Sequence, residues 1–215
     1  MMSSVAFDLG RKWARGVVAL AVVALAAAAS PASATVIFSD DFDLNALGLN
    51  MTPTGWSAVG GTVDIVGAGG VFASLCAGGP SPSRCIDLDG STGDAADLQT
   101  SVVVPTAGSY LLSFWLQPND RGGASDTVTV SFGSYSEVFT LPSAGNDADS
   151  WALYQRVVNI GSGGAQTLSF DHAGGDNIGI LLDNVQVETA VPEPATLLLL
   201  GSGITALTVR RRRRS

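Results

Sequence analysis

Short apolar runs separated by clusters of turn residues fill the chain between residues 35 and 190, and no stretch there keeps a helical period. Residues 126–132 show the pattern, because Val128, Val130 and Phe132 alternate with hydroxyl-bearing residues. Successive side chains of a strand point to opposite faces, so one face of this segment is apolar. Strands are expected at 36–38, 62–66, 71–76, 85–88, 97–104, 109–117, 126–132, 135–140, 151–159, 166–171 and 178–187. About ten short strands at this spacing predict an all-β fold, a β-sandwich of the jelly-roll type.

The segment 110–116 departs from this alternation, because it is apolar almost throughout. A continuous apolar run is typical of a strand that is buried on both faces. We therefore expect this strand at the centre of a sheet, with Trp115 in the core.

Charge is strongly segregated along the chain. Residues 35–190 hold three arginines against 17 aspartates and glutamates, a net charge of −14, and the remaining basic residues lie near the two ends. Such an acidic domain repels nucleic acid and anionic lipid, because contacts with phosphate need cationic side chains. We expect no nucleic-acid partner. The composition favours a domain that stays soluble outside the cell and that suits divalent cations.

The N-terminal segment has the three parts of a secretory signal peptide. Basic residues between positions 11 and 15 precede the apolar run 16–29, and the small residues Ala32-Ser33-Ala34 follow. The apolar run is shorter than the ~20 residues that a comfortable membrane span takes. We expect export through the Sec machinery and removal of residues 1–34. An uncleaved anchor helix is the alternative.

The chain has two cysteines, Cys76 and Cys85, on either side of a loop rich in Gly, Pro and Ser. Export brings them into an oxidising compartment, where a pair that flanks a short loop is expected to form one disulfide. A zinc site is disfavoured, because two cysteines without a nearby histidine supply too few ligands.

The C-terminal segment, residues 190–215, has three parts in order. They are the motif Val191, Pro192, Glu193 and Pro194, the apolar run 195–209, and the arginines Arg210, Arg211, Arg212, Arg213 and Arg214. As a helix the apolar run would be about 22 Å long, against a hydrocarbon core of about 30 Å. Arginine clusters stay on the cytoplasmic side, so these arginines are expected to act as a membrane stop with the C-terminus inside.

These three parts closely resemble the PEP-CTERM sorting domain of exported proteins of Gram-negative bacteria. The resemblance implies that an exosortase of the inner membrane recognises the tail and cleaves near Pro192-Glu193-Pro194. The protein would pass transiently through the inner membrane and reach the cell surface or an exopolysaccharide matrix, as biofilm-associated members of this family do. An ordinary tail anchor is the alternative.

A second set of short pieces resembles, in its order, the galactose-binding-like jelly rolls of many exported bacterial proteins. The pieces are Asp41-Phe42-Asp43, Gly55-Trp56, 85–91, 98–100, 110–114 and 182–187. Carbohydrate-binding modules share that fold, so an extracellular polysaccharide is an expected partner. A shared fold does not by itself establish sugar binding.

The second resemblance also implies a structural calcium ion where the first and last strands meet. The matching positions are Asp43 and Asp183, with Asp41 as a helper, and Ca²⁺ takes about six to eight oxygen ligands. A second candidate is Asp87-x-Asp89-Gly90 with Asp94, a fragment of an EF-hand-like loop without its terminal Glu. The alternative is that these aspartates cap turns by accepting backbone N–H groups.

Catalysis has little support in the sequence. The single histidine, His172, would have to serve any Ser-His-Asp hydrolase, and the chain has no Gly-x-Ser-x-Gly elbow. Zinc hydrolase motifs are also missing, and the only glutamates between residues 35 and 190 are Glu137 and Glu188. We therefore expect a protein that is not an enzyme.

Two hypotheses remain for residues 35–189, which we expect to form one domain. The first is a non-enzymatic protein of the cell surface or matrix. The second is a carbohydrate-binding module, for which Trp151 and Tyr154 are the candidate ligand-binding residues. These two aromatic side chains lie three positions apart beside a polar loop and are expected to be exposed.

Overall fold

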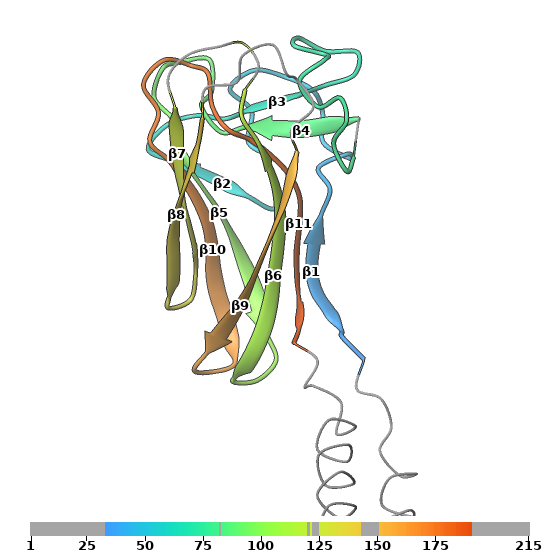
Figure 1. Cartoon of the computed structure of the whole chain (residues 1–215), viewed down its shortest axis with the longest axis vertical. Coiled ribbons are helices and arrows are strands. Elements are labelled where there is room, and N and C mark those ends of the chain that lie inside the picture. Colours follow the sequence, from blue (N-terminus) through green and yellow to red (C-terminus); the bar gives the residue numbers. More distant parts are fainter. Residues whose placement is uncertain (1–32, 82, 120, 122–124, 143–150, 191–215) are drawn as a thin grey trace, which may run out of the picture. The chain divides into compact units, whose positions relative to one another are not determined.

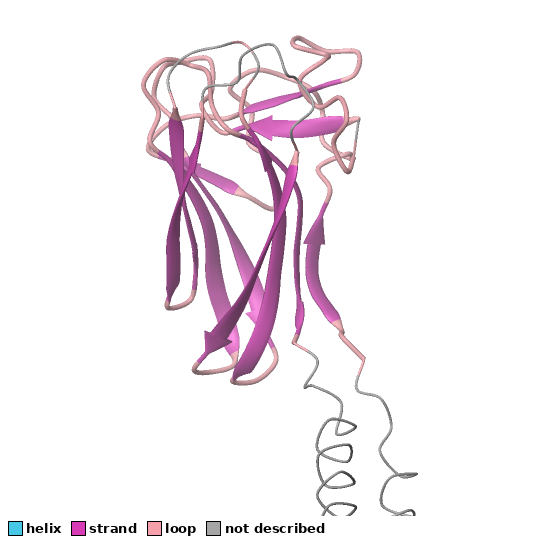
Figure 2. Cartoon of the chain, in the orientation of Figure 1, coloured by secondary structure: helices cyan, strands magenta, loops and turns pink. Residues whose placement is uncertain are grey.

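The computed structural model describes residues 33–81, 83–119, 121, 125–142 and 151–190. Thr35–Ala190 forms one compact unit, whose described part consists of strands and turns without a helix (Figure 2). The predicted signal peptide and sorting tail lie almost wholly outside the described residues, so their limits stay predictions. In the part of the chain that is described, no helix is long and apolar enough to cross a membrane.

Eleven strands, paired antiparallel, build the described part of this unit as two sheets. The strands are β1 (Val36–Asp40), β2 (Ser57–Val59), β3 (Asp64–Gly67), β4 (Arg84–Asp87), β5 (Asp97–Val104), β6 (Gly108–Gln117), β7 (Asp126–Phe132), β8 (Tyr135–Leu141), β9 (Ala152–Ile160), β10 (Gly164–His172) and β11 (Leu181–Thr189). The larger sheet has the order β3-β4-β11-β6-β9, with β1 also paired to β11, and the smaller has the order β2-β5-β10-β7-β8. The sheets face each other (Figure 1), which confirms the predicted jelly-roll sandwich.

Two segments differ from the expected strands. Residues 71–76 form turns, in which the Leu75 N–H donates to the Phe72 carbonyl, and Phe72 itself has a φ of 58°, outside the β region. The glycines on both sides of this segment allow the chain to turn back on itself. β2 was not expected, because it has only three residues and two of them are exposed.

The core fills the space between the two sheets. Val128, Val130 and Phe132 of β7 are fully buried, and the residues between them lie on the more accessible face, as the alternation predicts. Phe114 of β6 meets Phe170 of β10 edge to face, with 5.4 Å between the ring centroids. Aromatic rings therefore join the two sheets across the middle of the core.

The prediction that 110–116 is buried on both faces is wrong. β6 alternates along its length, and Trp115 is half-buried on the outer face of the larger sheet, whereas Phe114 and Leu116 are fully buried. A two-layer sandwich buries only the inner face of each sheet against the other. The apolar run therefore indicated a central strand correctly but not the burial of Trp115.

A second hydrophobic cluster lies outside the main core, on the side of the larger sheet that faces away from the smaller one. Its buried members are Val66, Leu75, Cys76, Cys85 and Leu181. A disulfide joins Cys76 to Cys85, which confirms the predicted pairing. The bond ties the turn segment before β4 to β4 itself, so the cluster holds this segment against the sheet.

The edge strands β8 and β9 are joined across the sandwich by an ion pair. Arg156 donates to both carboxylate oxygens of Glu137, at 2.6 and 2.7 Å, and Tyr135 donates to the same group at 2.7 Å. These hydrogen bonds, the one from Arg156 first, lower the pKa of Glu137 to about 2. The Arg156 guanidinium also lies 5.2 Å from the centre of the Phe139 ring. Charged groups thus bridge the gap between the two sheets at their open edges.

The two ends of the compact unit leave the sandwich side by side. β1 pairs antiparallel with β11, and beyond that pairing the Thr35 N–H donates to Thr189 Oγ1 at 2.9 Å while the Thr189 N–H donates to the Thr35 carbonyl at 2.9 Å. The Ala190 N–H donates to the Ser109 carbonyl at 3.0 Å. Hydrogen-bonded backbone therefore continues to the residue directly before Val191.

Candidate functional site

Asp183, one of the predicted calcium ligands, is fully buried near the start of β11. Its Oδ2 accepts the Ser81 N–H at 3.1 Å and its Oδ1 accepts the Asn184 N–H at 2.6 Å. Burial raises the pKa of Asp183 to about 7, and the nearby charges of Asp43 and Asp41 act in the same direction. The structure therefore brings the three predicted carboxylates close enough to interact electrostatically.

Asp41 and Asp43 lie in the turn that follows β1. Asp41 Oδ1 accepts the Asp43 N–H at 3.2 Å, which is the turn-capping role that the sequence left open. Asp43 Oδ1 is buried without a hydrogen-bond partner, and the Asp43 carbonyl accepts a hydrogen bond from Arg84 Nη1. Among the described residues, no group of three or more His, Cys, Asp or Glu is arranged to hold a metal ion.

The residues of the second calcium candidate, Asp87 and Asp89, lie in a cluster of hydrogen bonds that includes an ion pair. Asp87 is fully buried, and its Oδ2 accepts from Asn119 Nδ2 at 3.0 Å and pairs with Arg121 Nη2. Its Oδ1 accepts the Gly179 N–H at 2.9 Å and the Asp89 N–H at 3.2 Å. Both carboxylate oxygens of Asp87 thus accept hydrogen bonds, and the Arg121 guanidinium already places a positive charge beside them, which disfavours a metal ion at Asp87.

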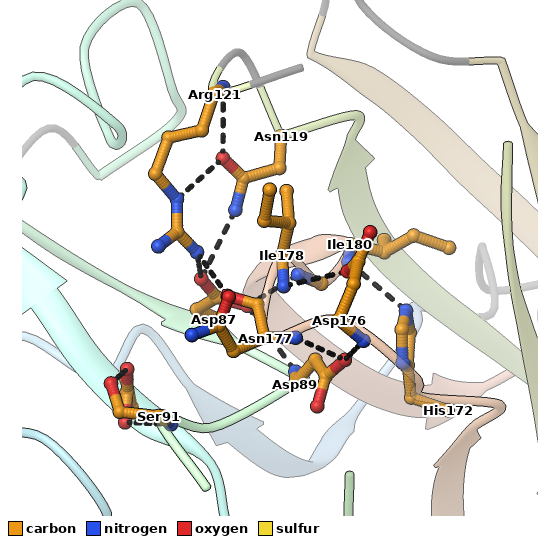
Figure 3. A network of polar contacts seen from close by, with 12 residues as sticks. Asp87, Asp89, Ser91, Asn119, Arg121, His172, Asp176, Asn177, Ile178 and Ile180 are labelled. Atoms are coloured by element: carbon orange, nitrogen blue, oxygen red, sulfur yellow. Dashed lines mark hydrogen bonds and ion pairs between the residues drawn. The ribbon is translucent and has the colours of Figure 1, made fainter. Parts of the chain in front are cut away.

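Asp89 and His172 extend this arrangement into a polar network (Figure 3). Asp89, also fully buried, accepts the Asn177 N–H at 3.2 Å. His172 Nδ1 lies 3.0 Å from the Gly174 nitrogen and His172 Nε2 lies 3.2 Å from the Ile180 nitrogen. The network therefore fixes the loop between β10 and β11 against the segment after β4.

His172 is held in its neutral form. Burial lowers its pKa, and both ring nitrogens face backbone N–H donors. A protonated imidazole accepts no hydrogen bond, and a neutral one accepts at a single nitrogen, so charging the ring would lose whichever contact is made. In the part of the chain that is described, the hydrogen-bond partners of both ring nitrogens are backbone N–H groups, so the ring acts as a structural acceptor.

The two aromatic residues predicted to bind a ligand do not form an exposed pair. Tyr154 points inward from β9 and packs on the main core, with its ring stacked 5.8 Å from that of Phe114. Trp151 packs on the disulfide cluster, and its Nε1 donates to the Ala77 carbonyl at 3.2 Å. An offset of three places residues on opposite faces of a strand, and Trp151 precedes β9.

The smaller sheet carries a shallow depression of about 270 Å³ on its outer face. It is lined by Gly55, Ser57, Gln99, Thr100, Ser101 and Thr167. Ser57 pairs with Gln99 between β2 and β5, and Thr167 pairs with Ser101 between β10 and β5, so these side chains share one face. The sequence analysis did not single out this group, although the alternation in 97–104 predicts a polar face for that strand.

Comparison with known proteins identifies the tail. Residues 190–214 match the family model of the PEP-CTERM protein-sorting motif, which confirms the resemblance drawn from the sequence. No curated protein matches the chain.

The sandwich has similar solved structures at low identity. A xylan-binding CBM22-1 domain of Paenibacillus barcinonensis Xyn10C is 15% identical, with 75% of this chain and 100% of that domain covered and a TM-score of 0.49. The cleaved adhesin domain K1 of Lys-gingipain from Porphyromonas gingivalis is 16% identical, with 74% and 99% covered and a TM-score of 0.47. The carbohydrate-binding module CBM6cm-2 of Cellvibrio mixtus lichenase 5A is 19% identical, with 73% and 99% covered and a TM-score of 0.41.

The buried network makes the stability of the domain depend on pH. Burial outweighs the opposing effect of Arg121 and raises the pKa of Asp87 from 3.8 to about 7. Between these values the folded protein holds a proton on Asp87 that the unfolded chain has released, so the contribution of Asp87 to stability is largest at low pH and falls as the pH rises toward 7. Asp87→Asn should reduce this fall by on the order of 1 kcal/mol per pH unit, measured by urea unfolding at pH 5 and pH 7.

The matched control for this prediction is Asp94→Asn, which changes an exposed aspartate in the neighbouring turn. The free energy of unfolding of this variant should change between pH 5 and pH 7 by the same amount as that of the parent protein. A parental pH profile in the Asp87→Asn protein would contradict the prediction.

Proposed function

We propose that this chain is an exported, non-enzymatic protein of the cell surface or the exopolysaccharide matrix, sorted through its tail by an exosortase. The observation that carries the proposal is the match of residues 190–214 to the PEP-CTERM protein-sorting motif. Val191, Pro192, Glu193 and Pro194 would form the recognised sequence. The arginines 210–214 would hold the C-terminus on the cytoplasmic side of a Gram-negative inner membrane until the tail is cut.

The end of the sandwich supports cleavage beside a folded domain. Thr189 and Ala190 are still hydrogen-bonded within the sandwich, and the sorting motif begins at the next residue. An enzyme can therefore reach the motif while the strands stay paired. The polar network supports a non-enzymatic role in turn, since the side chains of Asp87 and His172 are engaged in contacts that hold loops.

A carbohydrate ligand is the second candidate function, and the depression on the smaller sheet favours it. Ser57, Ser101 and Thr167 offer hydroxyl groups and Gln99 offers an amide on one face. Hydroxyl and amide groups both donate and accept, so they match the mixed donors and acceptors of sugar hydroxyls. Concave sites with a few convergent polar groups are the usual places of ligand binding.

We also propose a calcium ion at Asp183 and Asp43, with Asp41 as a helper. The residues fit such an ion in two respects: Asp183 is a fully buried carboxylate, and Asp43 Oδ1 is buried without a partner. A bound cation would compensate for the burial of these negative charges. Calcium accepts main-chain carbonyl oxygens as well as carboxylates, so two or three aspartates can form part of its ligand set.

The sorting motif is tested by replacing Pro192, Glu193 and Pro194 with alanines. These residues follow the last hydrogen-bonded strand, so the change should block processing without unfolding the body. Fractionation should find the uncut variant in the inner membrane and the parent at the surface or in the matrix. Intact-mass analysis of the parent should show a first residue of Thr35 and loss of the tail. Parental processing of the alanine variant would favour a simple tail anchor instead.

The carbohydrate ligand is tested by cosedimentation of the mature protein with exopolysaccharide from the same bacterium. Gln99→Ala together with Thr167→Ala removes the amide and one hydroxyl from the depression and should weaken binding about thirtyfold, since each of the two lost hydrogen bonds contributes about 1 kcal/mol. Thr140→Ala, an exposed position on the same sheet, is the matched control. Equal binding by all three proteins, or by none, would count against a sugar site in this depression.

The calcium ion is tested by thermal unfolding of the mature protein at pH 7.5. Calcium at about 100 times its dissociation constant should stabilise the folded state by about 2.7 kcal/mol, compared with the same protein in the presence of a chelator. Asp183→Asn should abolish this difference, whereas Asp94→Asn should retain it. The difference should shrink below pH 6, because the pKa of Asp183 is raised to about 7 and a protonated carboxyl binds calcium poorly. A chelator without effect on the parent would refute the site.

A further inference from the structure

One end of the described sandwich carries no charged side chain apart from Glu188. We call it the neutral end, and it comprises residues 35–36, 103–109, 133–134, 160–165 and 188–190. The strand register places these residues together, because Gly108 pairs with Ile160 and Gly164 pairs with Val104. Figure 1 shows the start of β1 and the end of β11 at this end of the molecule, beside the turns after β5 and β9.

Several aspartates lie away from the neutral end. Asp87, Asp89 and Asp176 belong to the polar network, and Asp183 lies near the start of β11. β11 runs from that region to the neutral end, and its nine residues span about 30 Å at about 3.3 Å per residue. This distance is several times the Debye length of about 8 Å at physiological salt.

Both segments that are proposed to be processed attach at the neutral end. Thr35 and Thr189 hold each other by two hydrogen bonds, and Ala190 is bonded to Ser109. Only residues 191–194 separate Ala190 from the apolar run that begins at 195, and these can extend over at most about 17 Å. While the tail is held in a membrane, chain connectivity therefore keeps Ala190 within that distance of the apolar run.

We infer that the neutral end is a membrane-facing surface, which lies against anionic phospholipid headgroups while the tail awaits processing. The inference rests on the proposed function, because the sorting tail is what holds the domain at the membrane. A domain with a net charge of −14 between residues 35 and 190 is repelled by an anionic surface. Facing the lipid with an end whose single charged side chain among the described residues is Glu188, and keeping Asp183 and the polar network about 30 Å away, weakens that repulsion.

Small apolar side chains add to the fit of this surface to lipid headgroups. Val36 and Val103 are 48% and 69% exposed. The turns of the neutral end are otherwise built from Gly, Ala, Ser, Thr and Pro, which are small and present no charge to desolvate. Such a surface can approach the headgroups closely without a specific partner for each side chain.

The first test adds charge to the neutral end of the full-length precursor. Thr106→Asp with Ser162→Asp places two negative charges on exposed turns. In cells that contain the exosortase, pulse-chase labelling should show processing slowed about fivefold for each added charge, the effect of about 1 kcal/mol at an anionic membrane surface. Ala73→Asp with Ser74→Asp is the matched control, because it adds the same charge to exposed positions in the turn segment before Cys76.

The control variant should be processed at the parental rate, and thermal unfolding of both mature variants checks that they fold. Equal processing rates for the two charge variants would overturn the inference. The alanine variant of Pro192, Glu193 and Pro194 separates this failure from that of the proposed function. If the alanine variant is blocked while both charge variants behave alike, only the membrane-facing surface is refuted.

The second test identifies what the neutral end touches. A photo-activatable amino acid at position 106 of the full-length chain, reconstituted into vesicles of phosphatidylethanolamine and phosphatidylglycerol, should form lipid adducts that mass spectrometry detects. The same amino acid at position 74 should form none. No lipid adduct at position 106, or equal adducts at both positions, would overturn the inference. In native membranes, adducts to a protein instead of lipid would assign the surface to the processing enzyme.

Discussion

The sandwich depends on the pairing of its last strand. β11 is an inner strand of the larger sheet, with β6 along one side and β4 and then β1 along the other. The register shifts between Asp183 and Gln186, and Asn184 there has a φ of 46°, so a bulge interrupts the pairing with β6. Among the described strands β1 pairs with β11 alone, so the larger sheet gains its first strand only when the chain is present to Glu188. Every strand that the structure describes precedes the sorting motif.

The acidity of the domain follows from how its loops are held. Four buried aspartates accept backbone N–H groups from distant segments: Asp64 from Asn50, Asp87 from Gly179, Asp89 from Asn177 and Asp183 from Ser81. The loops that contain these N–H groups are too irregular to satisfy all of them with main-chain carbonyls. Aspartate side chains supply the missing acceptors. The cost is burial of negative charge, which raises the pKa of Asp87 and Asp183 to about 7.

Local patterns in the sequence predicted the fold better than they predicted the site. Alternation located the buried face of β7, and the spacing of Cys76 and Cys85 predicted their disulfide, because both depend on neighbouring residues. The partners of Asp87 and Trp151 depend on distant ones: Arg121 is 34 positions from Asp87, and Ala77 is 74 positions from Trp151. Periodicity in the sequence does not report such contacts, so neither the ion pair of Asp87 nor the packing of the Trp151 indole could be predicted from it.

The ion pair between the edge strands has a consequence for a protein that is proposed to be crowded at a surface or in a matrix. β8 and β9 each end a sheet, and an open edge is a template on which another copy can add a strand. Arg156 and Glu137 stand on the faces of these strands that also carry Tyr154 and Phe139, so a second sandwich that continued either sheet would bring apolar side chains against a charged pair. Inward-pointing charge at an edge is a recognised defence against aggregation. The charged pair therefore disfavours the addition of strands from other copies at the β8 and β9 edges when the domain is packed at high density.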